Sequence, residues 1–212
     1  MSEARSSAAE FVPESRSLRA LREAAADCHG CALYKDATQT VFGVGPRKSR
    51  LMLVGEQPGD REDIEGEPFV GPAGGVLSRV LEEAGVDRDD VYLTNAVKHF
   101  KWRPQGKRRL HQTPRAREIG ACRPWLEAEL EAVRPAGLLA LGAIAGRSLF
   151  GPKVRVTKDR GRLLDSPLAP VAALTFHPSA ILRQRDHDDR EEAIAALVSD
   201  LRMVTAALAD AG

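Results

Sequence analysis

Leu51-Met-Leu-Val54 is an apolar run that continues directly into the segment Gly55-Glu-Gln-Pro-Gly-Asp60. A short apolar run that stops at a glycine predicts a buried β-strand followed by a sharp turn. Similar runs occupy residues 91–94, 138–141 and 171–176, and amphipathic helices are predicted at about residues 73–84, 115–133, 143–150 and 188–209. Such alternation is typical of a parallel sheet with helices on both faces. The sequence therefore predicts an α/β fold, a three-layer α/β/α sandwich with a central four-stranded parallel sheet.

The composition is that of an ordinary globular domain. The chain has 212 residues, of which 43% are hydrophobic and 29% are charged, and this length suits one domain with a substantial core. We expect a disordered polar tail over residues 1–15 and a single domain over residues 16–212. No apolar run is long enough to span a bilayer, and the N-terminus lacks the apolar segment of a secretory signal. The predicted location is the cytoplasm, without membrane contact.

Polar side chains follow three of the four predicted strands. Glu56 and Gln57 come directly after the first strand, Asn95 after the second and His177 after the fourth. Ligand sites in open α/β sheets form beyond the carboxyl ends of the strands. We therefore expect these side chains to converge on one crevice.

The chemistry of this crevice suits a planar ligand that forms hydrogen bonds. Glu56 could orient water or act as a base, and Asn95 offers both a donor and an acceptor to the edge of a pyrimidine. His177 could donate to a carbonyl oxygen, and Phe69 could stack on a base. Each residue also has an ordinary explanation: a surface carboxylate, a turn-capping amide, a helix-capping histidine or a core ring.

Three cysteines indicate a metal site. Cys28 and Cys31 form a C-x2-C pair, and Cys122 supplies a third sulfur from far along the chain. A disulfide is disfavoured in a reducing cytosol, and the pair precedes the first strand, unlike a redox dithiol. His99 is the best candidate for a fourth ligand, because His29 inside the C-x2-C loop is hard to direct at the same metal. By spacing alone, zinc and an iron–sulfur cluster are equally compatible, and buried thiols are the remaining alternative.

The positive charge of the chain is concentrated in one segment. Residues 98–117 carry eight Lys or Arg residues and no acidic residue, interleaved with aromatic and histidine side chains. The formal net charge of +1 hides this uneven placement. A basic segment with aromatic residues suits the phosphates and bases of a nucleic acid. A solvated surface loop is an equally good explanation on charge alone.

Taken together, these segments resemble the type-4 uracil-DNA glycosylases from about Cys28 to Arg183. The matching motifs are C-x2-C at 28–31, GEQPGD at 55–60, EGEPFVGPAG at 65–74, TNAVK at 94–98, ACRPWL at 121–126 and HPS at 177–179. The ordered set is specific, where each motif alone is weak. The resemblance implies an α/β/α sandwich, a [4Fe-4S] cluster and uracil as the excised base. It also implies that Phe69 stacks on the base, Asn95 reads its edge and His177 contacts its O2 carbonyl.

The sequence departs from the type-4 pattern in two places. Where that pattern has a cysteine soon after TNAVK, this chain has His99, so the implied cluster ligands are Cys28, Cys31, Cys122 and His99. An inserted loop over residues 106–111 resembles the KRRIH loop of the X-type subgroup (UdgX), with Leu110 in place of isoleucine. Gln57 also fits that subgroup. Its members bind uracil-containing DNA covalently through the loop histidine, which is His111 here.

The resemblance to the X-type subgroup leads to a specific hypothesis about the reaction. His111 attacks C1′ of the sugar before water can, and Glu56 orients the imidazole or takes its proton. His177 and Gln57 complete the expected catalytic set. The side chains expected to bind the substrate are Asp60, Phe69, Asn95 and Arg109, and those expected to contact DNA phosphates are Lys107, Arg108 and Arg183.

Two other functions compete with a covalent glycosylase. The first is an ordinary type-4 enzyme that releases uracil with turnover, in which His111 is only a DNA contact. The second is a non-catalytic nucleic-acid-binding module that carries an iron–sulfur cluster or zinc. The expected partner is uracil-containing DNA, with single strands preferred, and the chain is expected to act as a monomer.

Overall fold

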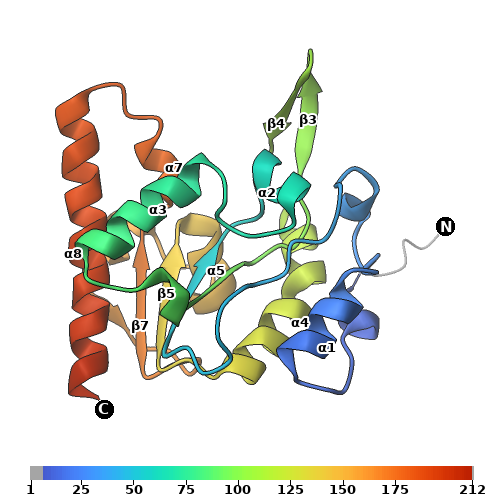
Figure 1. Ribbon diagram of the computed structural model, residues 1–212, viewed down its shortest axis with the longest axis horizontal. Coiled ribbons are helices and arrows are strands. Elements are labelled where there is room, and N and C mark those ends of the chain that lie inside the picture. Colours follow the sequence, from blue (N-terminus) through green and yellow to red (C-terminus); the bar gives the residue numbers. More distant parts are fainter. Residues whose placement is uncertain (1–6, 212) are drawn as a thin grey trace.

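The central sheet consists of the predicted strands and one short addition. The computed structural model describes residues 7–211, and its main sheet has the strand order β2-β1-β5-β7-β6 (Figure 1). Four buried strands are parallel neighbours, namely β1 (Leu51–Gly55), β2 (Val91–Asn95), β5 (Gly137–Leu141) and β7 (Val171–Thr175). They confirm the predicted parallel sheet. The fifth strand, β6 (Leu163–Leu164), is antiparallel to β7 at the sheet edge, and two residues are too few to form a sequence pattern.

Helices cover both faces of the sheet, as the sequence predicts. Successive side chains of a strand point to opposite faces. Leu53 belongs to the core that contains helices α3 (Pro72–Glu83) and α8 (His187–Asp210). Met52 belongs to the opposite core, with helices α4 (Ala116–Val133) and α5 (Ala143–Phe150). The four helices begin and end within one residue of the predicted positions.

A third core lies beside the sheet, where helix α1 (Leu18–Ala25) contacts α4. We call this core, which contains Cys28, Cys31 and Cys122, the cysteine lobe. It includes two 3-10 helices, η1 (Ala9–Phe11) and η2 (Ala32–Lys35). Ala8 is buried in it and donates its backbone N–H to the carbonyl of Ala121 at 2.8 Å. The tail predicted over residues 1–15 is therefore ordered from this point onward, and residues 1–6 lie outside the described residues.

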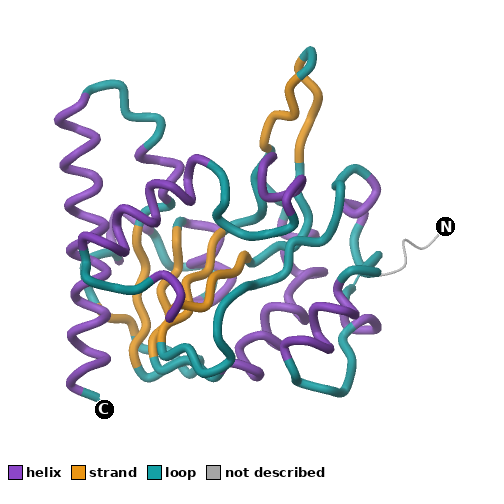
Figure 2. Tube along the Cα trace, in the orientation of Figure 1, coloured by secondary structure: helices purple, strands orange, loops and turns teal. Residues whose placement is uncertain are grey.

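An antiparallel hairpin projects from the body of the molecule (Figures 1 and 2). It consists of β3 (Trp102–Gln105) and β4 (Arg108–His111), which pair so that Trp102 faces His111. Gly106 lies in the turn with φ of +57°, where a glycine is favoured. The sequence predicts a loop over residues 106–111, and this prediction is wrong. Pro104 and the cationic residues conceal the alternation that marks a strand.

The remaining elements are short. They are α2 (Asp60–Glu65), η3 (Arg88–Asp90), α6 (Val156–Asp159) and α7 (Pro178–Ile181). Helix α2 follows the turn after β1, and α7 follows the turn after β7, so both begin at the carboxyl edge of the sheet. No helix in the described range combines the length and the apolar character of a membrane-spanning segment.

Candidate active site

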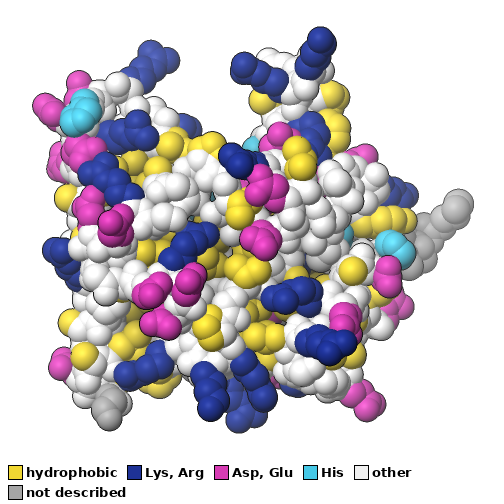
Figure 3. All heavy atoms as spheres, in the orientation of Figure 1, with side chains coloured by type: hydrophobic (Ala, Val, Ile, Leu, Met, Phe, Trp, Pro, Cys, Tyr) yellow, Lys and Arg dark blue, Asp and Glu magenta, His cyan; other side chains and the backbone are white. Residues whose placement is uncertain are grey.

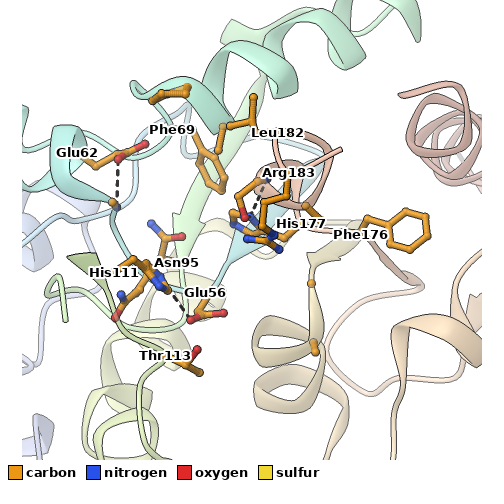
Figure 4. A pocket seen from close by; sticks show the side chains of 18 of the residues that line it. Glu56, Glu62, Phe69, Asn95, His111, Thr113, Phe176, His177, Leu182 and Arg183 are labelled. Atoms are coloured by element: carbon orange, nitrogen blue, oxygen red, sulfur yellow. Dashed lines mark hydrogen bonds and ion pairs between the residues drawn. The ribbon is translucent and has the colours of Figure 1, made fainter. Parts of the chain in front are cut away.

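A cavity of about 1050 Å³ lies at the carboxyl edge of the parallel sheet. Its lining includes residues that directly follow or end the strands: Glu56, Asn95, Gly142 and His177. The structure thus brings the polar residues together at this edge, as predicted. Figure 4 shows Glu56, Phe69, Asn95, His111 and His177 around one space, although they come from segments far apart in the sequence.

Phe69 and His177 form two facing sides of this cavity. Their ring centroids are 6.3 Å apart, and their planes are inclined by 29°. Phe69 has φ of +59°, a conformation that is costly for a bulky side chain. Arg88 donates to the Phe69 carbonyl at 2.9 Å, and Gly74 leaves room for it, because a Cβ there would lie 1.8 Å from the same oxygen. The protein thus holds the Phe69 ring against the cavity at the expense of backbone strain.

Asn95 ends strand β2 opposite Gly55 of strand β1. Its side chain is almost fully buried, and it lies so close to the neighbouring strand that a Cβ on Gly55 would be 2.3 Å from the Asn95 Oδ1 atom. Glycine at position 55 therefore leaves the space that the amide occupies. No protein hydrogen bond is recorded for this amide among the described residues, so its donor and acceptor are available to a ligand in the cavity.

His177 is fixed in one tautomer by the start of helix α7. Its Nδ1 accepts a hydrogen bond from the backbone N–H of Ser179 at 3.2 Å, and the Ser179 hydroxyl lies 2.8 Å from the same nitrogen. An accepting Nδ1 places the ring proton on Nε2. Burial, followed by the nearby positive charge of His111 and Arg183, lowers the pKa of His177 to about 4. The ring is therefore a neutral N–H donor at physiological pH.

Glu56 and His111 are neighbours in the lining of the cavity. His111 Nε2 stands 3.6 Å from Glu56 Oε1, which is too far for a hydrogen bond. Glu56 Oε1 is buried and has no hydrogen-bond partner among the described residues. Burial raises the pKa of Glu56 to about 6 against the opposing effect of Arg183. Burial, and then Arg183, lower the pKa of His111 from 6.5.

Gln57 joins the two legs of the hairpin at its base. The side chain is buried and donates to the backbone carbonyls of Lys101 and Gln112, both at 3.2 Å. Its own carbonyl accepts the backbone N–H of Lys101 at 3.2 Å. All of these contacts are to backbone atoms that flank β3 and β4. Gln57, which the sequence places in the catalytic set, is thus engaged with the hairpin.

Arg109 ties the hairpin to helix α2. Its guanidinium donates to the carboxylates of Asp60 at 2.5 Å and Asp63 at 2.6 Å. It also lies over the rings of Phe100 and Trp102, at 5.4 and 5.5 Å from their centroids. Asp60 lines the cavity. Asp60 and Arg109, two of the four residues predicted to bind substrate, therefore form an ion pair that fixes strand β4, which carries the candidate nucleophile.

Asp63 is a functional candidate that the sequence reasoning missed. It is completely buried, pairs with Arg109 and accepts the backbone N–H of Thr38 at 3.0 Å. In the sequence it is one acid among several in an exposed-looking stretch. The helical spacing of three residues from Asp60 to Asp63 was the available signal, because it puts both carboxylates on one face of α2.

The cationic residues predicted to contact DNA occupy two places. Arg183 lines the cavity, whereas Lys107 and Arg108 lie in the exposed tip of the hairpin, outside the cavity lining. In Figure 3, Lys and Arg side chains stand on the hairpin and on the opposite shoulder of the molecule, with a hollow between them. The arrangement suits a polyanion that passes over the cavity.

The cysteine lobe gathers the predicted metal ligands. Cys28, Cys31 and Cys122 are free and buried. Trp125 Nε1 donates to Cys28 Sγ at 3.2 Å, and the backbone N–H of Lys98 donates to Cys122 Sγ at 3.2 Å. Burial raises the pKa of the Cys31 thiol, and it raises that of Cys122 to about 12.

His99, the fourth predicted ligand, is also buried. Its Nε2 lies 3.0 Å from the Thr40 hydroxyl, which leaves Nδ1 for another partner. Burial lowers the pKa of this ring to about 4, so it is neutral, as a ligand must be. Among the described residues, no group of three or more His, Cys, Asp or Glu side chains is arranged to hold a single metal ion.

Known proteins match most of the chain. The family model of the uracil DNA glycosylase superfamily matches residues 42–202. The chain belongs to this superfamily. The type-4 uracil-DNA glycosylase of Thermotoga maritima is 42% identical over 165 residues, which cover 77% of this chain and 82% of that protein. The type-4 enzyme of Pyrobaculum aerophilum is 37% identical over 174 residues, covering 79% and 85%. The type-4 enzyme of Saccharolobus solfataricus is 38% identical over 163 residues, covering 73% and 72%.

The uracil-DNA glycosylase superfamily match includes every residue of the cavity lining and the whole hairpin. Cys28 and Cys31 precede the matched range, whereas His99 and Cys122 fall within it. Membership of the superfamily and similarity to type-4 enzymes agree with the resemblance seen in the sequence motifs.

Proposed function

We propose that the chain excises uracil from DNA and then stays covalently joined to C1′ of the deoxyribose through His111. The observation that carries the proposal is the pairing of His111 with Glu56, whose buried Oε1 atom lacks a hydrogen-bond partner among the described residues. A buried oxygen without a partner destabilises a folded protein. Its presence at a cavity wall, beside an imidazole, favours a catalytic role.

Excision begins when an unpaired or flipped uracil enters the cavity. Phe69 offers a stacking surface, and the Asn95 amide offers a donor and an acceptor to the pyrimidine edge. The Nε2–H of His177 suits the O2 carbonyl, where negative charge grows as the bond from C1′ to uracil N1 breaks. The electron pair of that bond leaves with uracil, and C1′ becomes electron-poor.

His111 then forms a new bond from a ring nitrogen to C1′. The attacking nitrogen needs its lone pair, and the lowered pKa of His111 keeps the ring neutral near neutral pH. Bond formation leaves the ring cationic until the other nitrogen releases its proton. Glu56 is placed to orient the ring or to accept that proton. Because water does not readily reverse an N-alkyl bond, each protein molecule acts once.

The hairpin contacts support attack by His111 in preference to water. Strand β4 is held through Arg109 by Asp60 and Asp63, and its base is held by Gln57. A nucleophile on a strand with so many fixed contacts loses little freedom when it reacts. A mobile loop, by contrast, would leave space in which water competes for C1′.

A [4Fe-4S] cluster held by Cys28, Cys31, Cys122 and His99 is part of this proposal. The four side chains are buried donors of the required types, and N–H groups from Trp125 and Lys98 point at two of the sulfurs, as around cluster thiolates. A cluster binds each ligand to a different iron, so it demands a wider arrangement than zinc does. When bound, it would cross-link the N-terminal segment, the β2 exit and helix α4. The zinc alternative would yield a colourless protein.

The proposed substrate is single-stranded DNA, bound by a monomer. Arg183 would meet a phosphate next to the flipped nucleotide, and Lys107 and Arg108 would meet phosphates further along the strand. A single strand supplies an already unstacked base, so the protein avoids the cost of opening a duplex. The hollow in Figure 3, with Lys and Arg side chains on the hairpin and Lys, Arg and acidic side chains on the opposite shoulder, leaves room for such a strand.

The covalent step is tested by incubating the protein with a labelled single strand that contains one uracil, followed by denaturing electrophoresis. We expect a protein–DNA band that survives detergent and heat, with a yield that saturates at one DNA per protein. His111→Ser should abolish that band and leave abasic DNA, because water can enter the vacated space. His187→Ser is the matched control, since His187 lies at the start of α8 and is exposed.

The same experiment separates the competing functions. Release of uracil over many turnovers without a stable band would establish an ordinary glycosylase and remove the covalent role of His111. Binding that does not depend on uracil, with no base released, would indicate a non-catalytic module. An unchanged band in His111→Ser would assign the nucleophile to another residue.

A further inference from the structure

Lys98 is a completely buried cation to which the proposed reaction gives no task. Its ammonium donates to the Thr94 hydroxyl at 2.6 Å, to the backbone carbonyl of Asn95 at 2.7 Å and to the carboxylate of Glu129. Glu129 lies on helix α4 and is also completely buried. The second acceptor is the notable one, because Asn95 carries the amide that faces the uracil cavity.

Glu129 is held as firmly as Lys98. Its carboxylate accepts hydrogen bonds from the backbone N–H of Gly43, from the Tyr92 hydroxyl and from the Thr94 hydroxyl, all at 3.0 Å. These donors come from the segment before β1 and from β2 itself. The ammonium of Lys98 is therefore directed by a carboxylate that is itself held in one position by these hydrogen bonds.

The same lysine touches the cysteine lobe through its backbone. Its N–H donates to Cys122 Sγ at 3.2 Å, and its carbonyl accepts the N–H of Val41 at 2.8 Å. Cys122 and Glu129 are seven residues apart on α4, which puts them on one face of that helix two turns apart. Lys98 thus contacts this face twice, once at a predicted cluster ligand and once at the ion-pair partner.

Stability alone does not explain this ion pair. The attraction between two buried charges offsets the free-energy cost of removing them from water only poorly. Two apolar side chains of similar size would often stabilise the fold as well. An ammonium group provides something that apolar packing cannot, namely direction, because its three donors are aimed at three defined acceptors. One of those acceptors is the last backbone carbonyl of β2, at the cavity.

We propose that Lys98 is a positioning residue that orients Asn95 for uracil and couples that orientation to the filled cysteine lobe. The proposal rests on the proposed function, in which Asn95 reads the base. Movement of Cys122 displaces the backbone of Lys98, which displaces its ammonium from the Asn95 carbonyl. A lobe without its cluster then presents a poorly oriented amide, although the cavity remains.

The test uses the charge-free double variant Lys98→Met/Glu129→Leu, because removal of one partner alone would leave a buried charge unpaired. Binding is measured by fluorescence anisotropy with single strands that carry either 2′-fluoro-2′-deoxyuridine, which resists excision, or thymidine. We expect about a tenfold loss of affinity for the uracil strand, the worth of one hydrogen bond to a charged group. Affinity for the thymine strand should stay unchanged, because the phosphate contacts are untouched.

Leu197→Ala is the matched control for general destabilisation. Leu197 is buried in α8, in the core on the other face of the sheet from Glu129. We expect it to lower the thermal midpoint at least as much as the double variant does while keeping the uracil preference. A double variant with unchanged uracil preference, or a control with the same loss of preference, would overturn the positioning role.

Removal of the cluster completes the experiment. In the wild-type protein, chelation under oxidising conditions should reduce the uracil preference, and in the double variant it should cause no further reduction. Equal reductions in both proteins would overturn the coupling. If the double variant does not fold, Thr94→Val replaces it, since this change removes the hydroxyl that contacts both Lys98 and Glu129. Failure of wild-type protein to excise uracil would instead refute the proposed function.

Discussion

At the scale of single residues, Glu56 and His111 respond to the same surroundings in opposite directions. Burial favours the neutral form of each group, so it raises the pKa of Glu56 to about 6 and lowers that of His111. Near neutral pH the carboxylate is consequently ionised while the imidazole keeps its lone pair. This combination is the one that a nucleophilic histidine with an adjacent base requires.

The pH dependence of adduct formation follows from these two pKa values. Single-turnover rates with a uracil strand should be constant above about pH 7 and fall as the pH drops through about 6, because Glu56 then gains a proton. Protonation of His111, whose pKa lies below its usual 6.5, adds to the fall. The neutral state of His177 changes only near its pKa of about 4, so it adds no step in this range. Glu56→Gln should remove the step near 6. Rates that keep rising well above neutral pH would contradict a lowered pKa for His111.

Gly74 and Gly75 form a matched pair for testing the strained Phe69. A Cβ at Gly74 would stand 1.8 Å from the Phe69 carbonyl, whereas a Cβ at Gly75 would meet nothing within 4 Å. Gly74→Ala should cost at least about 2 kcal/mol of the free energy of unfolding and should slow uracil excision. Gly75→Ala should gain up to about 1 kcal/mol, because alanine is the better helix former. Thermal unfolding and excision rates check both, and equal effects would show that Phe69 needs no such space.

At the scale of elements, the hairpin depends on Arg109. Arg109→Lys keeps one positive charge but offers a point donor in place of a planar fork, so it can satisfy Asp60 or Asp63 only in part. We expect the adduct to form about tenfold more slowly, with uracil excision affected less. The reason is that β4 becomes more mobile, so that His111 lies within reach of C1′ less often. Arg103→Lys, on the exposed strand β3, is the control. A normal adduct rate in Arg109→Lys would show that attack by His111 does not depend on a rigid hairpin.

The elements also show what the sequence could reveal. The four parallel strands and the four helices that cover the sheet have strong apolar patterns, and each was predicted, whereas helix α1, which is as long as α5, was not. The hairpin was missed because Pro104 and its charges do not alternate, and β6 was missed because two residues carry no period. The convergence of Glu56, Asn95 and His177 was predictable, because each follows or ends a predicted strand and parallel strands end at one edge of the sheet. Asp63 could be linked to Asp60 only by its helical spacing, and nothing in the sequence distinguishes Glu129 as a buried acid from an exposed one.

At the scale of the whole molecule, the two candidate centres are parts of one connected scaffold. Segment 94–99 runs from the end of β2, beside the cavity, into the cysteine lobe. Along this segment, the N–H of Val97 donates to the Glu56 carbonyl at 3.0 Å. The proposed catalytic carboxylate Glu56, the Asn95 amide proposed to read the base and the predicted cluster ligand His99 thus belong to this six-residue segment or contact it directly. Loss of the proposed cluster should therefore change the positions of the cavity side chains before the sheet itself unfolds.

The charge distribution of the whole molecule determines how it holds DNA. Although the net charge is only +1, Lys107 and Arg108 stand alone at the hairpin tip, away from acidic partners among the described residues. Replacing both by alanine should weaken binding to any single strand and reduce the slope of log affinity against log salt by about 1.4, because each lost phosphate contact on a single strand contributes about 0.7. Adduct yield at saturating protein should stay normal, since neither residue lines the cavity.

Arg19→Ala, on exposed helix α1, removes a charge far from the hairpin and should leave the slope unchanged. An unaltered slope in the double variant would mean that the hairpin carries the proposed nucleophile but that its tip does not contact DNA phosphates.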